Sequence, residues 1–303
     1  MNQAAGRNMS RRGLLGLGAT SAAAVALGSG LAGCAKPASE ANDGSVQTIR
    51  YGQDQSQFVE LTLPTPANGP LPVAVVIHGG FWRSVYGLDL GRPLASTLPE
   101  RGWAALNIEY RRVGNGGGYP STLADVAAAI DLLADAGLAA ARVKGLDLDL
   151  TKVVTIGHSA GGHLAAWAAT RGGQETGSPG AEPTVTVSAV VSQAGVLDLR
   201  ASARDGLGAG AAQAFLGGEP DQVPERYDAA SPMDRLPLGV PTLCVHASGD
   251  GNVPISQSET FVEAALAAGD EAELSTVDGD HFVVIDPADP SWALVLDWLD
   301  RFS

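Results

Sequence analysis

The sequence predicts an α/β fold in which a mostly parallel, eight-stranded sheet carries helices on both faces. Short apolar runs alternate with helical patterns along most of the 303 residues, and this alternation is typical of parallel strands joined by helices. The run Val73–Ile77 is apolar at every position, as expected of a strand that is buried on both faces. We therefore expect one large domain over residues 46–303, which is long enough to bury a sizeable core.

The expected elements can be assigned in chain order. Thr48–Tyr51 and Phe58–Leu63 are separated by a polar turn, so we expect the sheet to start with two antiparallel strands. Six further strands are expected at Val73–Ile77, Ala104–Ile108, Val153–Ile156, Val185–Val191, Thr242–Val245 and Ala272–Val277. Helices are expected at Leu88–Leu98, Leu123–Leu138, Phe261–Ala268 and Ser291–Phe302. Ser121 is the expected N-cap of the second helix, since a serine side chain can accept a hydrogen bond from the first turn.

Residues 199–235 interrupt the alternation of strands and helices. They include the helical run Ala209–Leu216, which is followed by Gly- and Pro-rich segments. Ligands of open α/β sheets bind at the carboxyl ends of the strands. We expect this region to be a small cap or insertion over that edge of the sheet.

The N-terminal residues 1–33 have the composition of an export signal. Arg11 and Arg12 form a twin-arginine pair, and an apolar, Gly/Ala-rich run follows them. The run ends in Leu31-Ala32-Gly33-Cys34, which resembles a bacterial lipobox, in which the cysteine is acylated and becomes the first mature residue. We therefore expect an exported lipoprotein that is anchored on the extracytoplasmic side of a bacterial membrane.

This interpretation makes Cys34 the lipidated residue and residues 34–45, which are small and polar, a flexible tether to the domain. A membrane-spanning anchor and a cleavage without lipid are the alternatives. Cys244 is the second of the two cysteines, and its apolar surroundings in the sequence predict a buried packing residue.

The chain is strongly acidic, with 33 Asp and Glu residues against 19 Lys and Arg residues and a formal net charge of −14. A surface of this charge repels polyanions, so we expect no nucleic-acid partner. No cysteine and histidine cluster has the spacing of metal ligands, and the glycine-rich stretch at Gly114–Gly118 lacks the lysine of a phosphate-binding loop. We therefore expect neither a metal nor a cofactor.

The stretch Val153–Ala166 carries the clearest chemical signal. A β-branched run enters Gly157-His158-Ser159-Ala160-Gly161, and an Ala-rich helical run leaves it. A Gly-x-Ser-x-Gly turn between a strand and a helix is a nucleophile elbow, which exposes the serine hydroxyl on a strained turn. The N-terminus of the helix also directs N–H groups to the place where negative charge develops. Ser159 is therefore the predicted nucleophile.

A serine nucleophile needs a general base, and the base needs a group that orients it. Of the five histidines, His281 lies in the loop directly after the last expected strand. Asp250 lies in the loop after the preceding strand, so that serine, acid and histidine follow in the chain order typical of this elbow. We predict His281 as the base and Asp250 as the acid, with Asp280 as the alternative acid.

The attacked carbonyl needs fixed hydrogen-bond donors for the oxyanion. The predicted donors are the N–H of Ala160, which follows the serine, and that of Gly80 or Phe81 in the loop after the third expected strand. Trp82 and Phe282 adjoin these catalytic elements and are the predicted substrate-pocket residues. Glu109–Arg112 is expected to be a structural ion-pair cluster, and a rim that holds a charged substrate is the alternative.

These motifs together resemble the α/β-hydrolase superfamily. The segments that match its small esterases are His78–Trp82, Gly157–Gly162, Asp250 with Val253-Pro254, and Asp280–Phe282. The His-Gly-Gly-aromatic-Trp form and Glu109-Tyr110-Arg111 are similar to bacterial feruloyl-esterase-type and kynurenine-formamidase-like carboxylesterases. The resemblance implies hydrolysis of a small ester or aryl amide through an acyl-serine intermediate. A serine peptidase of the same fold and a non-catalytic binding module are the alternatives.

Overall fold

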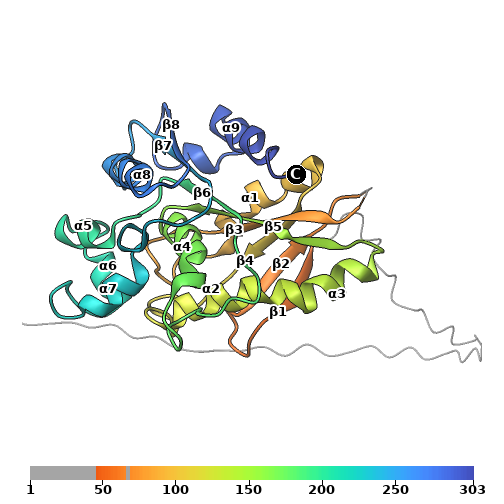
Figure 1. Cartoon of the computed structure of the whole chain (residues 1–303), viewed down its shortest axis with the longest axis horizontal. Helices are drawn as coiled ribbons and strands as arrows, with labels where there is room; N and C mark the ends of the chain where they lie inside the picture. Colours follow the sequence, from red (N-terminus) through yellow and green to blue (C-terminus); the bar gives the residue numbers. More distant parts are fainter. Residues whose placement is uncertain (1–45, 66–68) are drawn as a thin grey trace, which may run out of the picture. The chain divides into compact units, whose positions relative to one another are not determined.

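The eight expected strands form one sheet, whose order is β1-β2-β4-β3-β5-β6-β7-β8. The computed structural model describes residues 46–65 and 69–303, so the predicted signal, Cys34 and the whole of the tether lie outside the described residues. The strands are β1 (Gln47–Arg50), β2 (Phe58–Thr62), β3 (Leu71–Ile77), β4 (Ala104–Ile108), β5 (Leu148–His158), β6 (Ala189–Gln193), β7 (Thr242–Ala247) and β8 (Ala272–Val277) (Figure 1). The first two strands pair in antiparallel fashion, as does β2 with β4, and all other pairs are parallel.

Two strands, β5 and β6, begin four or more residues away from their expected starts. β6 begins at Ala189, four residues after the expected start at Val185, because its position is fixed by pairing with β5, where Val154 lies opposite Ala189. β5 begins at Leu148, which pairs with Leu71 of β3 ahead of an irregularity in the register. Apolar character therefore located both strands, but pairing with neighbouring strands set their ends.

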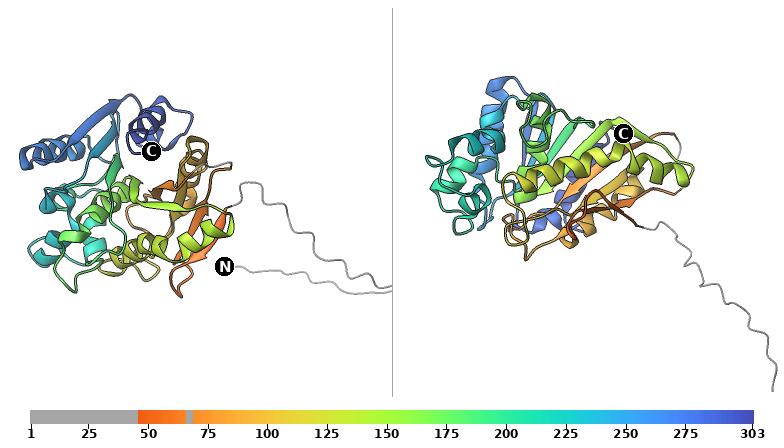
Figure 2. Two further views of the ribbon diagram at one scale, coloured as in Figure 1. Left: turned by 45° about the vertical axis from the view of Figure 1, so that its right-hand side comes forward. Right: turned by 90° about the horizontal axis from the view of Figure 1, so that it is seen from below.

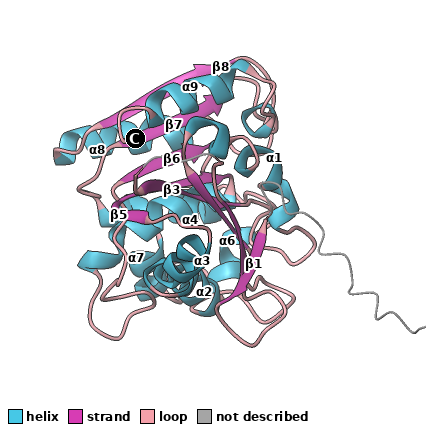
Figure 3. Ribbon diagram, turned by 90° about the vertical axis from the view of Figure 1, so that its right-hand side faces the viewer, coloured by secondary structure: helices cyan, strands magenta, loops and turns pink. Residues whose placement is uncertain are grey.

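Helices cover both faces of the sheet (Figure 3). Val73, Val75 and Ile77 of β3 pack in the larger core, under α2 (Ser121–Asp131), α3 (Ala136–Val143), α4 (Ala160–Ala169) and α8 (Ser256–Ala268). Ala74 and Val76 point to the other face, which is covered by α1 (Arg92–Ala95) and α9 (Pro290–Leu299). Burial of each such valine or isoleucine contributes about 1.5–3 kcal/mol, so this alternation fixes the register of the central strand.

Two of the expected helices are divided into shorter ones. The region expected as Leu88–Leu98 contains the 3-10 helix η1 (Leu88–Leu90) and α1, and a second 3-10 helix, η2 (Leu98–Arg101), follows. The region expected as Leu123–Leu138 contains α2, the 3-10 helix η3 (Leu132–Ala134) and the start of α3. Ser121 is the first residue of α2 and not its cap, because Pro120 occupies the N-cap position and no side chain caps the helix.

Residues 199–235 form the expected helical insertion, between β6 and β7. It consists of α5 (Leu199–Arg204), α6 (Ala211–Leu216), α7 (Pro224–Ala230) and the 3-10 helix η5 (Pro232–Arg235). The insertion, drawn in cyan, lies next to α8 in the views of Figures 1 and 2. Gln257 of α8 holds its start, because the Gln257 amide accepts from the Asp198 N–H and donates to the Asp198 carbonyl. In the part of the chain that the structure describes, no helix is both long and apolar enough to span a membrane.

Candidate active site

Ser159 lies between the end of β5 and the start of α4, at φ 57° and ψ −121°. Its N–H donates to the carbonyl of Gln193 at the end of β6, at 2.8 Å. The turn requires glycine on both sides. A Cβ atom at Gly157 would lie 2.0 Å from the carbonyl oxygen of Gly161, and one at Gly161 would lie 2.0 Å from that of Ile77. The sequence therefore forms the strained strand–turn–helix unit that the Gly-x-Ser-x-Gly pattern predicts.

Asp250 and His281, which follow β7 and β8, lie together at the carboxyl edge of the sheet. Nδ1 of His281 is 2.6 Å from Oδ2 of Asp250, and both side chains are at most 5% exposed. The alternative acid, Asp280, is exposed, and its Oδ1 accepts from the N–H of Phe282 instead. Because the carboxylate engages Nδ1, Nε2 is the ring nitrogen that can exchange a proton with a serine.

His158 brings the histidine loop next to the serine. Its Nε2–H donates to the backbone carbonyl of His281 at 2.8 Å, and the two rings lie 4.4 Å apart between centroids. His158 directly precedes Ser159, so this contact ties the loop after β8 to the elbow. Burial lowers the pKa of His158 to about 3, so the ring stays neutral and keeps the proton that the carbonyl accepts.

The Asp250 carboxylate is surrounded by donors. Besides His281, its Oδ1 accepts from the N–H groups of Asn252 and Val253, at 2.8 and 2.9 Å, and its Oδ2 lies 3.3 Å from Nε2 of His246. Burial alone would raise the pKa of Asp250, but the hydrogen bonds from His246, His281 and Val253 outweigh burial and hold the pKa below its usual value. The group therefore remains a fixed anion at neutral pH.

The loop after β3 passes directly against the serine. A Cβ atom at Gly79 would lie 3.0 Å from Cβ of Ser159. Gly80, Phe81 and Trp82 all have positive φ angles, of 111°, 51° and 54°. Within the described residues, the N–H groups of Gly80, Phe81 and Ala160 donate to no backbone carbonyl. The predicted oxyanion donors are thus unpaired amides at the correct edge of the sheet. We call residues 80–83 the oxyanion loop.

Trp82 does not have the position expected of a pocket residue. Its side chain is 0% exposed, because its ring stacks on Phe215 of the insertion at 4.8 Å and its indole N–H donates to Nδ1 of His163 at 3.2 Å. Phe282, the other predicted pocket residue, is 53% exposed beside His281. Tyr86, which the sequence did not indicate, is 44% exposed and packs its ring against Gly80. Phe282 and Tyr86 are therefore the aromatic side chains available to a substrate.

Three histidines support the site in ways that the sequence did not reveal. His158 holds the His281 loop, as described above. His246 donates through Nε2 to the Val253 carbonyl at 3.0 Å, with Oδ2 of Asp250 at 3.3 Å, and its Nδ1 accepts from the Ser258 hydroxyl at 2.8 Å. His163 accepts from Trp82 and donates through Nε2 to the Ala230 carbonyl at 2.8 Å, and burial lowers its pKa to about 4. A buried histidine needs hydrogen-bond partners. The position of these three histidines next to or inside apolar runs is therefore the sequence signal that could have identified their supporting contacts.

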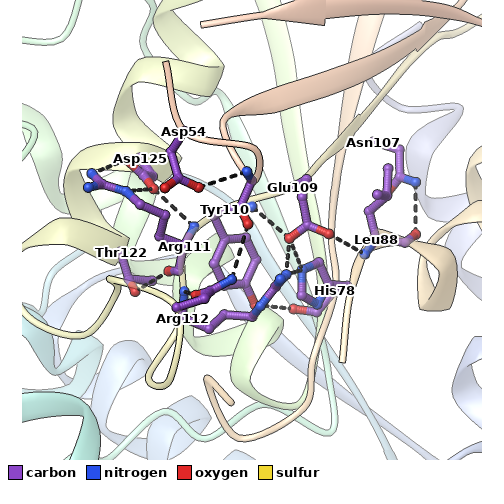
Figure 4. A network of polar contacts seen from close by, with 12 residues as sticks. Asp54, His78, Leu88, Asn107, Glu109, Tyr110, Arg111, Arg112, Thr122 and Asp125 are labelled. Atoms are coloured by element: carbon purple, nitrogen blue, oxygen red, sulfur yellow. Dashed lines mark hydrogen bonds and ion pairs between the residues drawn. The ribbon is translucent and has the colours of Figure 1, made fainter. Parts of the chain in front are cut away.

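The Glu109–Arg112 segment forms a network of ion pairs and hydrogen bonds with His78 and Leu88 (Figure 4). Glu109 pairs with Arg112, lies 3.3 Å from Nε2 of His78, and accepts from the N–H of Leu88 at 3.0 Å. The Tyr110 hydroxyl donates to the His78 carbonyl at 2.7 Å, and the two rings are stacked. The Arg112 side chain is only 7% exposed, so it supports the structural interpretation and not a rim for a charged substrate.

No cluster of three or more His, Cys, Asp or Glu side chains suited to a metal ion occurs in residues 46–65 and 69–303. The buried thiol of Cys244 is equally unsuited to chemistry, because burial raises its pKa to about 12. The groups that the described site brings together are the Ser159 hydroxyl, the His281 imidazole and the Asp250 carboxylate.

The sheet order, with Ser159 on the turn after the fifth strand and an acid and a histidine after the seventh and eighth, defines the α/β-hydrolase fold. The resemblance expected from the motifs is therefore confirmed. More narrowly, the chain belongs to the BD-FAE family, whose model matches residues 59–265. The matched range includes Ser159 and Asp250 and ends before His281, so the position of the histidine rests on the structure.

Comparisons with individual proteins agree with this family. Esterase LipC of Mycobacterium tuberculosis is 30% identical over 234 residues, which are 72% of this chain and 54% of LipC. The chain thus spans about half of the length of that relative. A truncated carbohydrate esterase from gut microbiota superimposes with a TM-score of 0.72 at 20% identity, covering 86% of this chain and 97% of its own. Thermogutta terrifontis esterase 2, phosphoramylated by tabun, has a TM-score of 0.66 at 24% identity, with 86% and 94% covered. The two solved structures show the shared fold.

Proposed function

We propose that this protein is a serine hydrolase that cleaves small carboxylic esters or aryl amides through an acyl-serine intermediate. The observation that carries the proposal is the 2.6 Å hydrogen bond between His281 and Asp250, in a loop that His158 ties to the serine elbow. A binding module would have no need of a strained serine beside an oriented imidazole. The similarity to esterase LipC supports an ester as the substrate class.

In the proposed reaction, Oγ of Ser159 attacks the substrate carbonyl and its proton passes to Nε2 of His281. Asp250 keeps the proton on Nδ1 and stabilises the imidazolium that forms. The N–H groups of Ala160 and of Gly80 or Phe81 bind the oxyanion, and losing one such donor costs about 3 kcal/mol of transition-state stabilisation. His281 then protonates the leaving alcohol or amine. Water attacks the acyl-serine in a second round of the same steps, with His281 again as the base.

The test is hydrolysis by the purified full chain of p-nitrophenyl esters with acyl chains of increasing length, aryl formamides and peptide p-nitroanilides. We expect release of p-nitrophenol and covalent labelling by a fluorophosphonate probe. Ser159→Ala should abolish labelling and lower kcat by roughly 10⁴- to 10⁶-fold. Unlabelled wild-type protein with no ester hydrolysis would overturn the proposal, and cleavage of the anilides alone would favour the peptidase alternative.

We further propose that the chain is exported and held at a membrane by a lipid on Cys34. The twin-arginine pair, the apolar run and the Leu31-Ala32-Gly33-Cys34 motif support this proposal. Metabolic labelling with an alkyne fatty acid, followed by membrane fractionation, tests it. We expect labelled protein in the membrane fraction and an unlabelled product from Cys34→Ala. Labelling of that variant, or unlabelled wild-type protein, would contradict the proposal.

A further inference from the structure

Three consecutive side chains of the oxyanion loop contact the helical insertion. The Phe81 ring packs against the backbone of Gly208, since a Cβ atom at Gly208 would lie 2.5 Å from the ring. Trp82 stacks on Phe215 of α6, with nearly parallel rings. The guanidinium of Arg83 donates to the carbonyl of Gly208 and lies 5.9 Å from the centroid of the Phe81 ring. The insertion is thus joined to the loop on which the oxyanion donors lie.

The backbone of this loop needs such support. Phe81 and Trp82 have left-handed φ angles of 51° and 54°. This conformation costs a residue with a side chain about 1–2 kcal/mol, and it persists only where the surroundings enforce it. Val113 fixes the far end of the loop through backbone hydrogen bonds, from its N–H to the Trp82 carbonyl and from the Ser84 N–H to its own carbonyl.

The amides of Gly80 and Phe81 cannot serve as anchors in the same way. A donor that is to bind an oxyanion must remain unpaired in the resting protein, so backbone hydrogen bonds through these amides would remove their function. Their position must therefore be set by other groups of the loop: the Gly80 carbonyl, which accepts from the Arg83 N–H at 2.9 Å, and the side chains, which pack on their surroundings. Tyr86 packs against Gly80, and the packing partners that the insertion provides are Gly208 for Phe81 and Phe215 for Trp82.

We propose that the insertion of residues 199–235 positions the oxyanion loop, with Gly208 and Phe215 as its positioning residues. The inference rests on the proposed hydrolase function. Gly208 has a φ angle of 57°, and the Phe81 ring fills the space in which any side chain would lie. Phe215 is 1% exposed and meets both Trp82 and His163. The insertion thus acts on the transition state, in addition to any role as a cover over the substrate.

Two glycines of the same segment provide a matched test. Gly206 and Gly208 both have left-handed φ angles, of 65° and 57°, so alanine is strained to a similar degree at either position. A Cβ atom at Gly206 meets nothing within 4 Å, whereas one at Gly208 collides with Phe81. In the full chain, Gly208→Ala should lower kcat on p-nitrophenyl acetate at least tenfold per active site, with KM within threefold of wild type. Gly206→Ala should keep kcat within twofold.

A second pair of variants covers the case in which Gly208→Ala does not fold. Phe215→Leu removes the stack on Trp82, and Tyr227→Leu removes a fully buried aromatic ring elsewhere in the insertion. We expect Phe215→Leu, but not Tyr227→Leu, to lower kcat and to weaken inhibition by a trifluoromethyl ketone, which mimics the tetrahedral intermediate, by the same factor. Active sites are counted by complete fluorophosphonate labelling, so that loss of folded protein is not read as loss of kcat.

The outcomes separate this inference from the function on which it rests. Wild-type kcat in both Phe215→Leu and any folded Gly208→Ala protein would overturn the inference while leaving the hydrolase intact. Equal losses in Phe215→Leu and Tyr227→Leu would also overturn it, because the effect would then come from the integrity of the insertion and not from the loop contact. An inactive wild-type protein would instead remove the proposed function.

Discussion

The two sides of the candidate site are held in different ways. The oxyanion loop has a strained backbone, which is held at its far end by hydrogen bonds to Val113 and on the side of the free amides by side chains that pack on the insertion. The Asp250 and His281 loops contain, among the described residues, no non-glycine residue with a positive φ angle, and they are fixed by hydrogen bonds. The difference follows from the task of each side. Oxyanion donors must remain unpaired, whereas a base and its acid work only when their hydrogen bonds are already made.

Replacing the acid should break the hydrogen-bonded side most severely. In Asp250→Asn the amide can donate to Nδ1 of His281, which favours the tautomer whose proton is on Nε2 and removes the acceptor for the serine proton. We expect kcat for p-nitrophenyl acetate to fall by about 10⁴-fold while the fold is kept. Steady-state kinetics and circular dichroism provide the measurement.

Asp280→Asn is the matched control, because Asp280 is the neighbouring exposed carboxylate and its contact to the Phe282 N–H can be kept by asparagine. Its kcat should stay within threefold of wild type. A large loss of kcat in Asp280→Asn together with a small loss in Asp250→Asn would show that Asp280, and not Asp250, is the acid that orients His281.

Lowering the pH should reduce the free energy of unfolding, because both sides of the site contain buried neutral histidines. Burial lowers the pKa of His78 and of His158 to about 3 and that of His163 to about 4, against about 6.5 in the unfolded chain. Below pH 6.5 the unfolded state therefore binds more protons than the native state. Each histidine should lower the free energy of unfolding by about 1.4 kcal/mol per pH unit as the pH falls from 6.5 toward 4.5.

Urea unfolding at a series of pH values measures this slope. His163→Gln should flatten the slope by about 1.4 kcal/mol per pH unit, because one proton fewer is taken up on unfolding. A free energy of unfolding that is constant between pH 6.5 and 5 would show that the three histidines are not held neutral in the native protein.

Removing the donor of His158 should have a smaller effect, confined to the hydrogen-bonded side. His158→Phe keeps an aromatic ring but leaves the carbonyl of His281 without its buried donor, which costs about 1–3 kcal/mol. We expect kcat to fall about tenfold with little change in KM, because the base is displaced from the serine. The measurement is ester kinetics per labelled active site. Inhibition by the trifluoromethyl ketone is then compared between His158→Phe and Phe215→Leu. The comparison shows whether each residue supports the oxyanion loop or the His281 loop.

An unchanged kcat in His158→Phe would mean that the His281 loop is held adequately by other contacts, chiefly that of the Gln193 side chain with the Val284 carbonyl. The contrast between a packed side and a hydrogen-bonded side would then apply to Asp250 and not to the loop after β8.

The sequence predicted those features that depend on local pattern. The alternation of apolar runs and helices predicted eight strands, and the glycines around Ser159 predicted the elbow, because each is determined by neighbouring residues. Chain order selected Asp250 and His281, which lie 2.6 Å apart in the structure, since strands of a parallel sheet present their following loops at one edge. The strand ends, as at β6, were set by pairing and could not be read locally.

Features that depend on distant partners were not predictable. Trp82 was expected to face a substrate, but Phe215, far along the chain, covers its ring. The orientation of His158 depends on the turn at Ser159 and on a carbonyl that the loop after β8 supplies. The sequence shows which side chains are present in a turn, but it does not show the direction in which the turn points each of them.

The position of β8 has a consequence for how the protein loses activity on heating. Among the described strands, β8 lies at the end of the sheet and pairs only with β7, and it is more exposed than the central strand β3. Opening of an edge strand requires less free energy than global unfolding. Fraying at this edge would carry His281 away from Ser159 while the other seven strands remain folded. Thermal inactivation of the proposed hydrolase should therefore precede the loss of secondary structure, so that one edge strand, and not the melting temperature of the domain, limits the temperatures at which it is active.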